Sequence, residues 1–205
     1  MKNSWTGSEA HAMVAAEDDL ALSVHRCLSG AFERLIERFE GPLFNYAHGI
    51  LQNTFDAQEV VQDALMRAHR ALTKQYDEAR VAALALRPWL FRTVRNLSLN
   101  KRRSRRGNGL NQPLTDFDDA CLGPFVNDAH DSVTRREEAE LLRRAIALMP
   151  VEARELIVLR FMEDMPYAEI ARTLGSSEAA LRGKVFRALK LLREALEKRG
   201  VTYAM

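Results

Sequence analysis

The sequence predicts an all-α protein made of two small helical domains joined by a flexible acidic linker. Apolar residues recur at helical spacing along most of the chain, as in Phe32, Leu35, Ile36 and Phe39. No window shows the alternation of β-branched and polar residues that is typical of a strand. The helical pattern stops over residues 107–134, which contain three glycines, two prolines, five acids and no lysine or arginine. Helix breakers over such a length indicate a linker between domains.

These pattern changes divide the chain into four segments. Residues 1–24 are weakly patterned, and we expect a partly disordered N-terminal extension. Residues 25–106 form the first domain, residues 107–134 the linker and residues 135–200 the second domain. Because proline lacks an amide donor, we expect a kink or a break at Gly41-Pro42, with Pro42 opening a second helix.

The second domain begins with two predicted scaffold helices. Pro150 separates them, and the second helix spans Val151 to Met162. Together with the two helices that follow, they predict a compact four-helix domain. The first scaffold helix is expected to bury an apolar stripe formed by Leu141, Leu142, Ala145, Ile146 and Met149.

The last two helices have the pattern of a helix-turn-helix. Tyr167, Ile170 and Leu174 share one apolar face, Gly175 ends that helix, and Ser177 is a predicted N-cap for the next. The second helix is the right size for a major groove, and its exposed faces are basic. An ordinary helical hairpin with a solvated basic face is the plainer alternative. The candidate DNA contacts are Ser177, Glu178, Arg182, Lys184 and Arg187.

A second basic segment precedes the linker. Seven lysine or arginine residues and no acid lie between Arg92 and Arg106, beside the aromatic residues Trp89 and Phe91. A basic helix with neighbouring aromatics can bind phosphates and stack unpaired bases. The alternative is a solvated face or a disordered tail, but the run continues a patterned apolar helix. The candidates here are Arg92, Arg95, Asn96, Lys101, Arg102 and Arg103.

The helix-turn-helix and the basic segment before the linker together resemble the extracytoplasmic-function (ECF) group of bacterial RNA polymerase sigma factors of the sigma-70 family. The string DAQEVVQDALMRAHR, from Asp56 to Arg70, is similar to the sigma region 2 helix that docks on the polymerase clamp. His69 departs from the family pattern, which commonly has Trp at this position. The string WLFRTVRN, from Trp89, is similar to the promoter-melting helix. The resemblance covers about residues 31–193.

The resemblance implies a transcription initiation factor that reads the −10 element with region 2 and the −35 element with region 4. It implies core RNA polymerase, promoter DNA and an anti-sigma factor as partners. The connection between residues 73 and 86 looks longer than is usual in the family. The implied polymerase contacts are Asp56, Glu59, Gln62, Asp63 and Arg67.

Other classes of function find little support in the sequence. The net charge is only +2, which argues against a globally basic, histone-like protein. The five histidines have neither metal-pair spacing nor a nucleophile signature, so we expect no enzyme activity, metal or cofactor. Cys27 and Cys121 are isolated and are expected to be plain reduced thiols, with a redox disulfide as the alternative. No membrane span or secretory signal is evident, which predicts a cytoplasmic chain.

Two other hypotheses remain open. A self-standing helix-turn-helix regulator would leave the clamp-like helix unexplained and would need a dimerisation segment, which is not evident. A helical enzyme or RNA-binding protein is disfavoured because no site is recognisable. Promoter-specific transcription with core polymerase would separate the three.

Overall fold

The computed structural model of the chain describes residues 19–107 and 133–198. Every regular element in these two ranges is helical, which confirms the all-α class. The predicted N-terminal extension and linker lie largely outside the described residues, as does Cys121. In chain order, the labelled elements are α2 (Ala31–Leu51), α3 (Thr54–Arg70), η1 (Ala71–Gln75), α4 (Glu78–Ala82), α5 (Leu86–Gly107), α6 (Val133–Ala147), α7 (Val151–Ile157), η2 (Val158–Met162), α8 (Tyr167–Leu174) and α9 (Glu178–Glu197).

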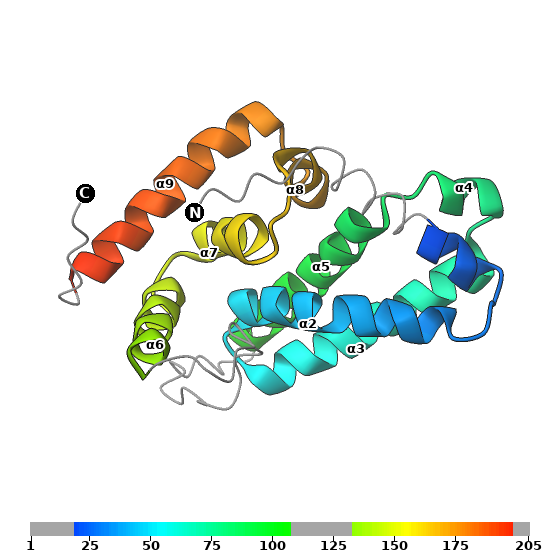
Figure 1. The fold of residues 1–205 in the computed structure, drawn as a ribbon, viewed down its shortest axis with the longest axis horizontal. Helices are drawn as coiled ribbons and strands as arrows, with labels where there is room; N and C mark the ends of the chain where they lie inside the picture. The colour runs from blue at the N-terminus through cyan, green and yellow to red at the C-terminus, as the bar shows by residue number, and fades with distance from the viewer. Residues whose placement is uncertain (1–18, 108–132, 199–205) are drawn as a thin grey trace.

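The helices α2, α3 and α5 form the N-terminal bundle, in which each contacts the other two (Figure 1). Of the expected kink or break at Gly41-Pro42, the break is wrong, because α2 continues through Pro42 as one helix. Phe39 and Leu43 lie on either side of the proline and are both buried on the same face. Proline removes one backbone hydrogen bond, and packing of that face against α3 and α5 offsets the loss.

Local contacts set the limits of α3. Asn53 caps its start, because the side-chain oxygen of Asn53 accepts a hydrogen bond from the Asp56 amide at 2.9 Å. Near its end, His69 packs edge-on against Phe32, with the ring centroids 4.6 Å apart. The residue that departs from the family pattern therefore still makes an aromatic contact. The π-helical turn η1 then leads to the short helix α4.

The helices α6 to α9 form the C-terminal domain, in which α9 contacts α6, α7 and α8. The predicted buried stripe of α6 is only partly right. Ala145 and Met149 are buried, but Leu142 is exposed. Leu141 and Ile146 are half-buried. Leu142 follows helical spacing, but the neighbouring helices cover a narrower strip of α6 than the pattern predicts.

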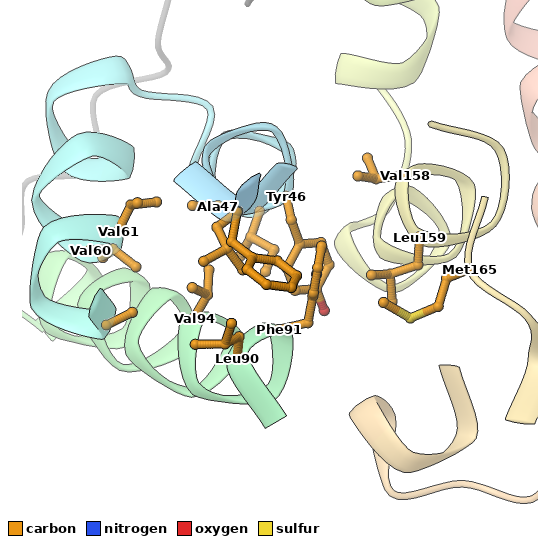
Figure 2. Close-up of a cluster of buried hydrophobic side chains, with 14 of the residues drawn as sticks. Tyr46, Ala47, Val60, Val61, Leu90, Phe91, Val94, Val158, Leu159 and Met165 are labelled. Atoms are coloured by element: carbon orange, nitrogen blue, oxygen red, sulfur yellow. The ribbon is translucent and has the colours of Figure 1, made fainter. Parts of the chain in front are cut away.

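The bundle and the C-terminal domain pack directly against each other. α2 contacts α7 and η2, and α5 contacts α8. Figure 2 shows Val158, Leu159 and Met165 from the C-terminal domain beside Tyr46 and Phe91 from the bundle. All five side chains are buried and belong to one hydrophobic cluster. The interdomain face, as we call these packed surfaces, has no counterpart in the sequence-based expectations.

Candidate nucleic-acid and polymerase interfaces

The turn between α8 and α9 is built by two residues with distinct roles. Gly175 ends α8 with φ 64° and ψ 42°, in the left-handed region that glycine adopts without steric cost. The side-chain oxygen of Ser177 accepts a hydrogen bond from the Ala180 amide at 3.3 Å and so caps α9. The predicted stop and cap are both confirmed, and together they set where α9 begins.

The helix α9 turns an apolar face inward and leaves its basic side chains in solvent. Leu181, Val185 and Ala188 are buried, as their spacing predicts. The opposite surface is positively charged and long enough to lie along a major groove. All the candidates for −35 recognition are exposed there or at the N-terminal end of α9: Ser177, Glu178, Arg182, Lys184 and Arg187.

Phe186 is an exposed aromatic residue on α9 that is absent from the sequence-based candidates. Its side chain is 72% exposed, between buried Val185 and exposed Arg187. A phenylalanine on a groove-facing helix can contact thymine methyl groups. The sequence signal that could have identified Phe186 is its position, because it is an apolar residue outside the buried face of a basic helix.

Arg182 is the one α9 candidate with a described aromatic partner. Its guanidinium lies over the Tyr167 ring, 4.9 Å from the centroid, and Arg160 lies 5.4 Å from the same ring. Such cation–π contacts contribute about 0.5–1 kcal/mol at exposed sites. The first helix of the motif therefore restricts the side chain that projects from the middle of the second.

The basic candidates on α5 differ in accessibility. Arg92, Asn96 and Arg103 are exposed. Arg102 is half-buried, and its buried Nη1 atom has no hydrogen-bond partner among the described residues. The ring of Phe91 is fully buried in the hydrophobic cluster that spans both domains, so in this arrangement it is not accessible for base stacking.

Arg95 points into the interdomain face and pairs with Glu155 of α7. Its Nε lies 2.7 Å from one carboxylate oxygen and its Nη2 lies 3.3 Å from the other. Tyr46 donates its hydroxyl to the same carboxylate at 3.0 Å. Burial raises the pKa of Tyr46 well above its usual value, and the negative charge of Glu155 adds to this effect. A candidate DNA contact is thus already engaged by an acid of the other domain.

Ion pairs link the C-terminal part of α5 to the start of α3. Asp56 is only 7% exposed, and its carboxylate lies 2.7 Å from Arg105 and 3.5 Å from Lys101. Lys101 also lies 2.6 Å from Glu59. The structure therefore brings together residues predicted separately for polymerase and for DNA.

The outer surface of α3 carries a mixed polar and apolar stripe. Phe55 and Met66 are exposed at 74% and 63%. Asp63 and Arg67 form an ion pair with each other at 2.9 Å, one helical turn apart. Exposed apolar side chains among polar ones are typical of a protein-binding surface. The exposed polymerase candidates on this surface are Glu59, Gln62 and Arg67, with Asp63 half-exposed.

The described parts of the chain lack two other kinds of functional feature. Residues 19–107 and 133–198 contain no group of three or more His, Cys, Asp or Glu side chains arranged to hold a metal ion. None of the described helices combines the length and apolar character that crossing a bilayer requires. Cys27 is a free, exposed cysteine.

Comparison with known proteins decides the family. The model of sigma-70 region 2 matches residues 35–107, and the model of sigma-70 region 4 matches residues 139–192. The ECF RNA polymerase sigma factor SigM of Mycobacterium tuberculosis is 30% identical over 159 residues, which cover 77% of this chain and 73% of SigM. The chain belongs to the ECF RNA polymerase sigma factors. Sigma factors are transcription regulators.

Two further similarities place this sigma factor among its relatives. The probable RNA polymerase sigma factor RfaY of Xanthomonas campestris pv. campestris is 27% identical over 85% of this chain, which spans 42% of RfaY's length. The sigma factor RpoE of Bartonella quintana, solved in complex with the anti-sigma factor NepR, has a similar fold with a TM-score of 0.60. That similarity covers 82% of this chain and 98% of RpoE, at 20% identity.

In family terms, the N-terminal bundle is region 2 and the C-terminal domain contains region 4. The turn before α9 lies near α5, because a Cβ atom at Gly175 would lie 3.7 Å from the guanidinium of Arg92. The two candidate DNA-binding elements of this sigma factor are therefore neighbours in the structure.

Proposed function

We propose that this sigma factor binds core RNA polymerase through the outer surface of α3, opens the −10 element with α5 and reads the −35 element with α9. The observation that carries the proposal is the combination of elements in one chain. A capped, exposed, basic α9 lies in one domain, and a basic α5 ion-paired to a polar docking helix lies in the other. A self-standing repressor would not need a basic α5 that is ion-paired to a docking helix.

Phosphate contacts would orient the protein, and base contacts would give it sequence preference. Arg182 is the proposed base reader because it projects from the middle of α9, where base edges are nearest. Lys184 and Arg187 are proposed phosphate contacts. On α5, Arg92, Asn96 and Arg103 are exposed and can contact the promoter directly.

The polymerase supplies all nucleotidyl-transfer chemistry in this proposal, and the sigma factor supplies recognition and opening. We propose residues 25–106 and 135–200 as the functional domains, acting in the cytoplasm. An anti-sigma factor is the proposed regulator, because a solved protein of similar fold is held by one.

Transcription in vitro tests the proposal. The purified chain is added to core polymerase with a library of genomic promoter fragments, and transcript starts are mapped. We expect starts that share −35 and −10 elements and that disappear when either the chain or core polymerase is omitted. Double charge reversal, Glu59→Arg with Asp63→Arg, should weaken binding to core polymerase without unfolding the chain. Palindromic binding by a dimer, with no stimulated transcripts, would instead favour a self-standing regulator.

A further inference from the structure

The interdomain face joins acids of region 4 to cations of region 2. Glu155 is 3% exposed and meets the guanidinium of Arg95 with both of its oxygens. A guanidinium recognises carboxylate and phosphate with the same planar, two-pronged geometry. Glu155 therefore makes the type of contact with Arg95 that a promoter phosphate would make.

A second pair of contacts follows the same pattern about two turns away on α5. Arg87 lies 3.7 Å from the carboxylate of Glu169 in α8, and it donates a hydrogen bond to the backbone carbonyl of Glu163. Asn45 of α2 lies within 3.5 Å of the Glu163 carboxylate. Region 4 thus turns several acids toward the basic side of region 2, in the orientation that favours association.

Close apolar packing completes the interdomain face. A Cβ atom placed on Gly49 of α2 would lie 3.1 Å from the Cγ2 atom of Val158, which is closer than ordinary van der Waals contact. Leu159 and Met165 lie beside Tyr46 and Phe91 (Figure 2). Phe91, the aromatic ring that adjoins the basic run, is fully buried in the same hydrophobic cluster.

We propose that in the free sigma factor region 4 closes on the promoter-opening side of region 2, and that Glu155 takes the place of a promoter phosphate at Arg95. This inference rests on the proposed role of α5 in promoter opening. Region 4 and DNA then compete for the same guanidinium, and the apparent affinity for DNA falls with the fraction of open molecules. Opening releases Arg95.

The ion pair can be tested in the full-length chain. Glu155→Gln removes the charge and keeps the shape, while Glu152→Gln removes an exposed charge from the same helix. The measurements are the dissociation constant for a fluorescently labelled single-stranded DNA and the radius of gyration by small-angle scattering. We expect Glu155→Gln to bind DNA about tenfold more tightly and to show a larger radius. Glu152→Gln should match the wild-type chain in both.

A charge swap keeps the test decisive if Glu155→Gln folds poorly. Arg95→Glu and Glu155→Arg should each open the molecule, because each places two like charges together in a buried site. The double variant restores an opposite-charge pair and should regain the compact radius, although without Arg95 it should bind DNA weakly. Wild-type affinity and radius in a folded Glu155→Gln chain would overturn the proposal, as would a double variant as open as the single ones.

Failure of this inference can be told apart from failure of the proposed function. If the wild-type chain directs promoter-specific transcription and Glu155→Gln binds DNA no better, only the closed arrangement is wrong. If the wild-type chain gives no transcripts with core polymerase, the proposed function fails, whatever the scattering shows.

Discussion

Arg182 and Arg187 both project from α9 into solvent, but their surroundings differ. Arg182 lies over the Tyr167 ring, whereas no described aromatic contact involves Arg187. A side chain held by a ring reaches DNA with less loss of rotamer freedom, which suits a base contact. A side chain at the edge of the helix is better suited to a phosphate, which carries no sequence information.

Alanine substitutions should separate these two roles. We expect Arg182→Ala to flatten the ranking of −35 variants, because a bidentate arginine–guanine contact contributes about 1–3 kcal/mol of discrimination. Arg187→Ala should weaken transcription from all variants alike. Start-site quantification on a set of −35 substitutions measures both effects. An unchanged ranking with Arg182→Ala would show that another residue reads the bases.

Glu163 should make stability depend on pH. Burial raises its pKa from 4.5 to about 7, although Asn45 and Arg87 face the carboxyl and oppose the shift. Between these pH values the unfolded chain has released the proton and the folded chain retains it, so stability falls as pH rises. The loss amounts to about 3 kcal/mol at most.

Replacing the carboxyl should remove this part of the pH dependence. We expect Glu163→Gln to melt at a higher temperature than the wild-type chain above pH 7, with a smaller difference near pH 4.5. Asp164→Asn is the matched control, because Asp164 is exposed and asparagine also accepts its positive φ. Burial also raises the pKa of Glu169, so the melting temperature of every variant keeps some dependence on pH. If the melting temperatures of Glu163→Gln and of the wild-type chain change equally with pH, the raised pKa of Glu163 is contradicted.

At the scale of elements, features set by near neighbours were predictable from the sequence. The end of α8 and the cap of α9 depend on Gly175 and Ser177, which act within a few residues of themselves. The continuity of α2 through Pro42 depends instead on packing against α3 and α5. The partner of Arg95 lies 60 residues further along the chain and leaves no local signal. Residue type therefore identified the candidates, and tertiary contacts determined which of them are free.

The exposed cations of α5 should govern the salt dependence of DNA binding. We expect the double variant Arg92→Gln with Arg103→Gln to reduce the log–log salt slope for single-stranded DNA by about 0.7 for each lost phosphate contact. Arg34→Gln removes an exposed charge from α2 and should leave the slope unchanged. Titrations at several salt concentrations measure the slope. Equal slopes for the double variant and Arg34→Gln would show that α5 is only a solvated face.

At the scale of the whole molecule, the closed arrangement depends on how nearly the two regions approach each other. Gly49 and Gly41 both lie within α2, but only Gly49 faces the other region. A side chain at Gly49 would meet Val158, whereas a Cβ atom at Gly41 has no neighbour within 4 Å. The same substitution at the two positions therefore separates an effect on the helix from an effect on the interdomain face.

Gly49→Gln should push the regions apart and leave each of them folded. The Cβ atom of the new side chain would crowd Val158 at 3.1 Å, and the packed interior around Val158 has little room to give. We expect a larger radius of gyration and tighter binding of single-stranded DNA, with wild-type helicity by circular dichroism. Gly41→Gln should keep the compact radius. Its helicity shows whether a side chain next to Pro42 destabilises α2. If both variants stay compact, the contact between α2 and η2 does not hold the two regions together in solution.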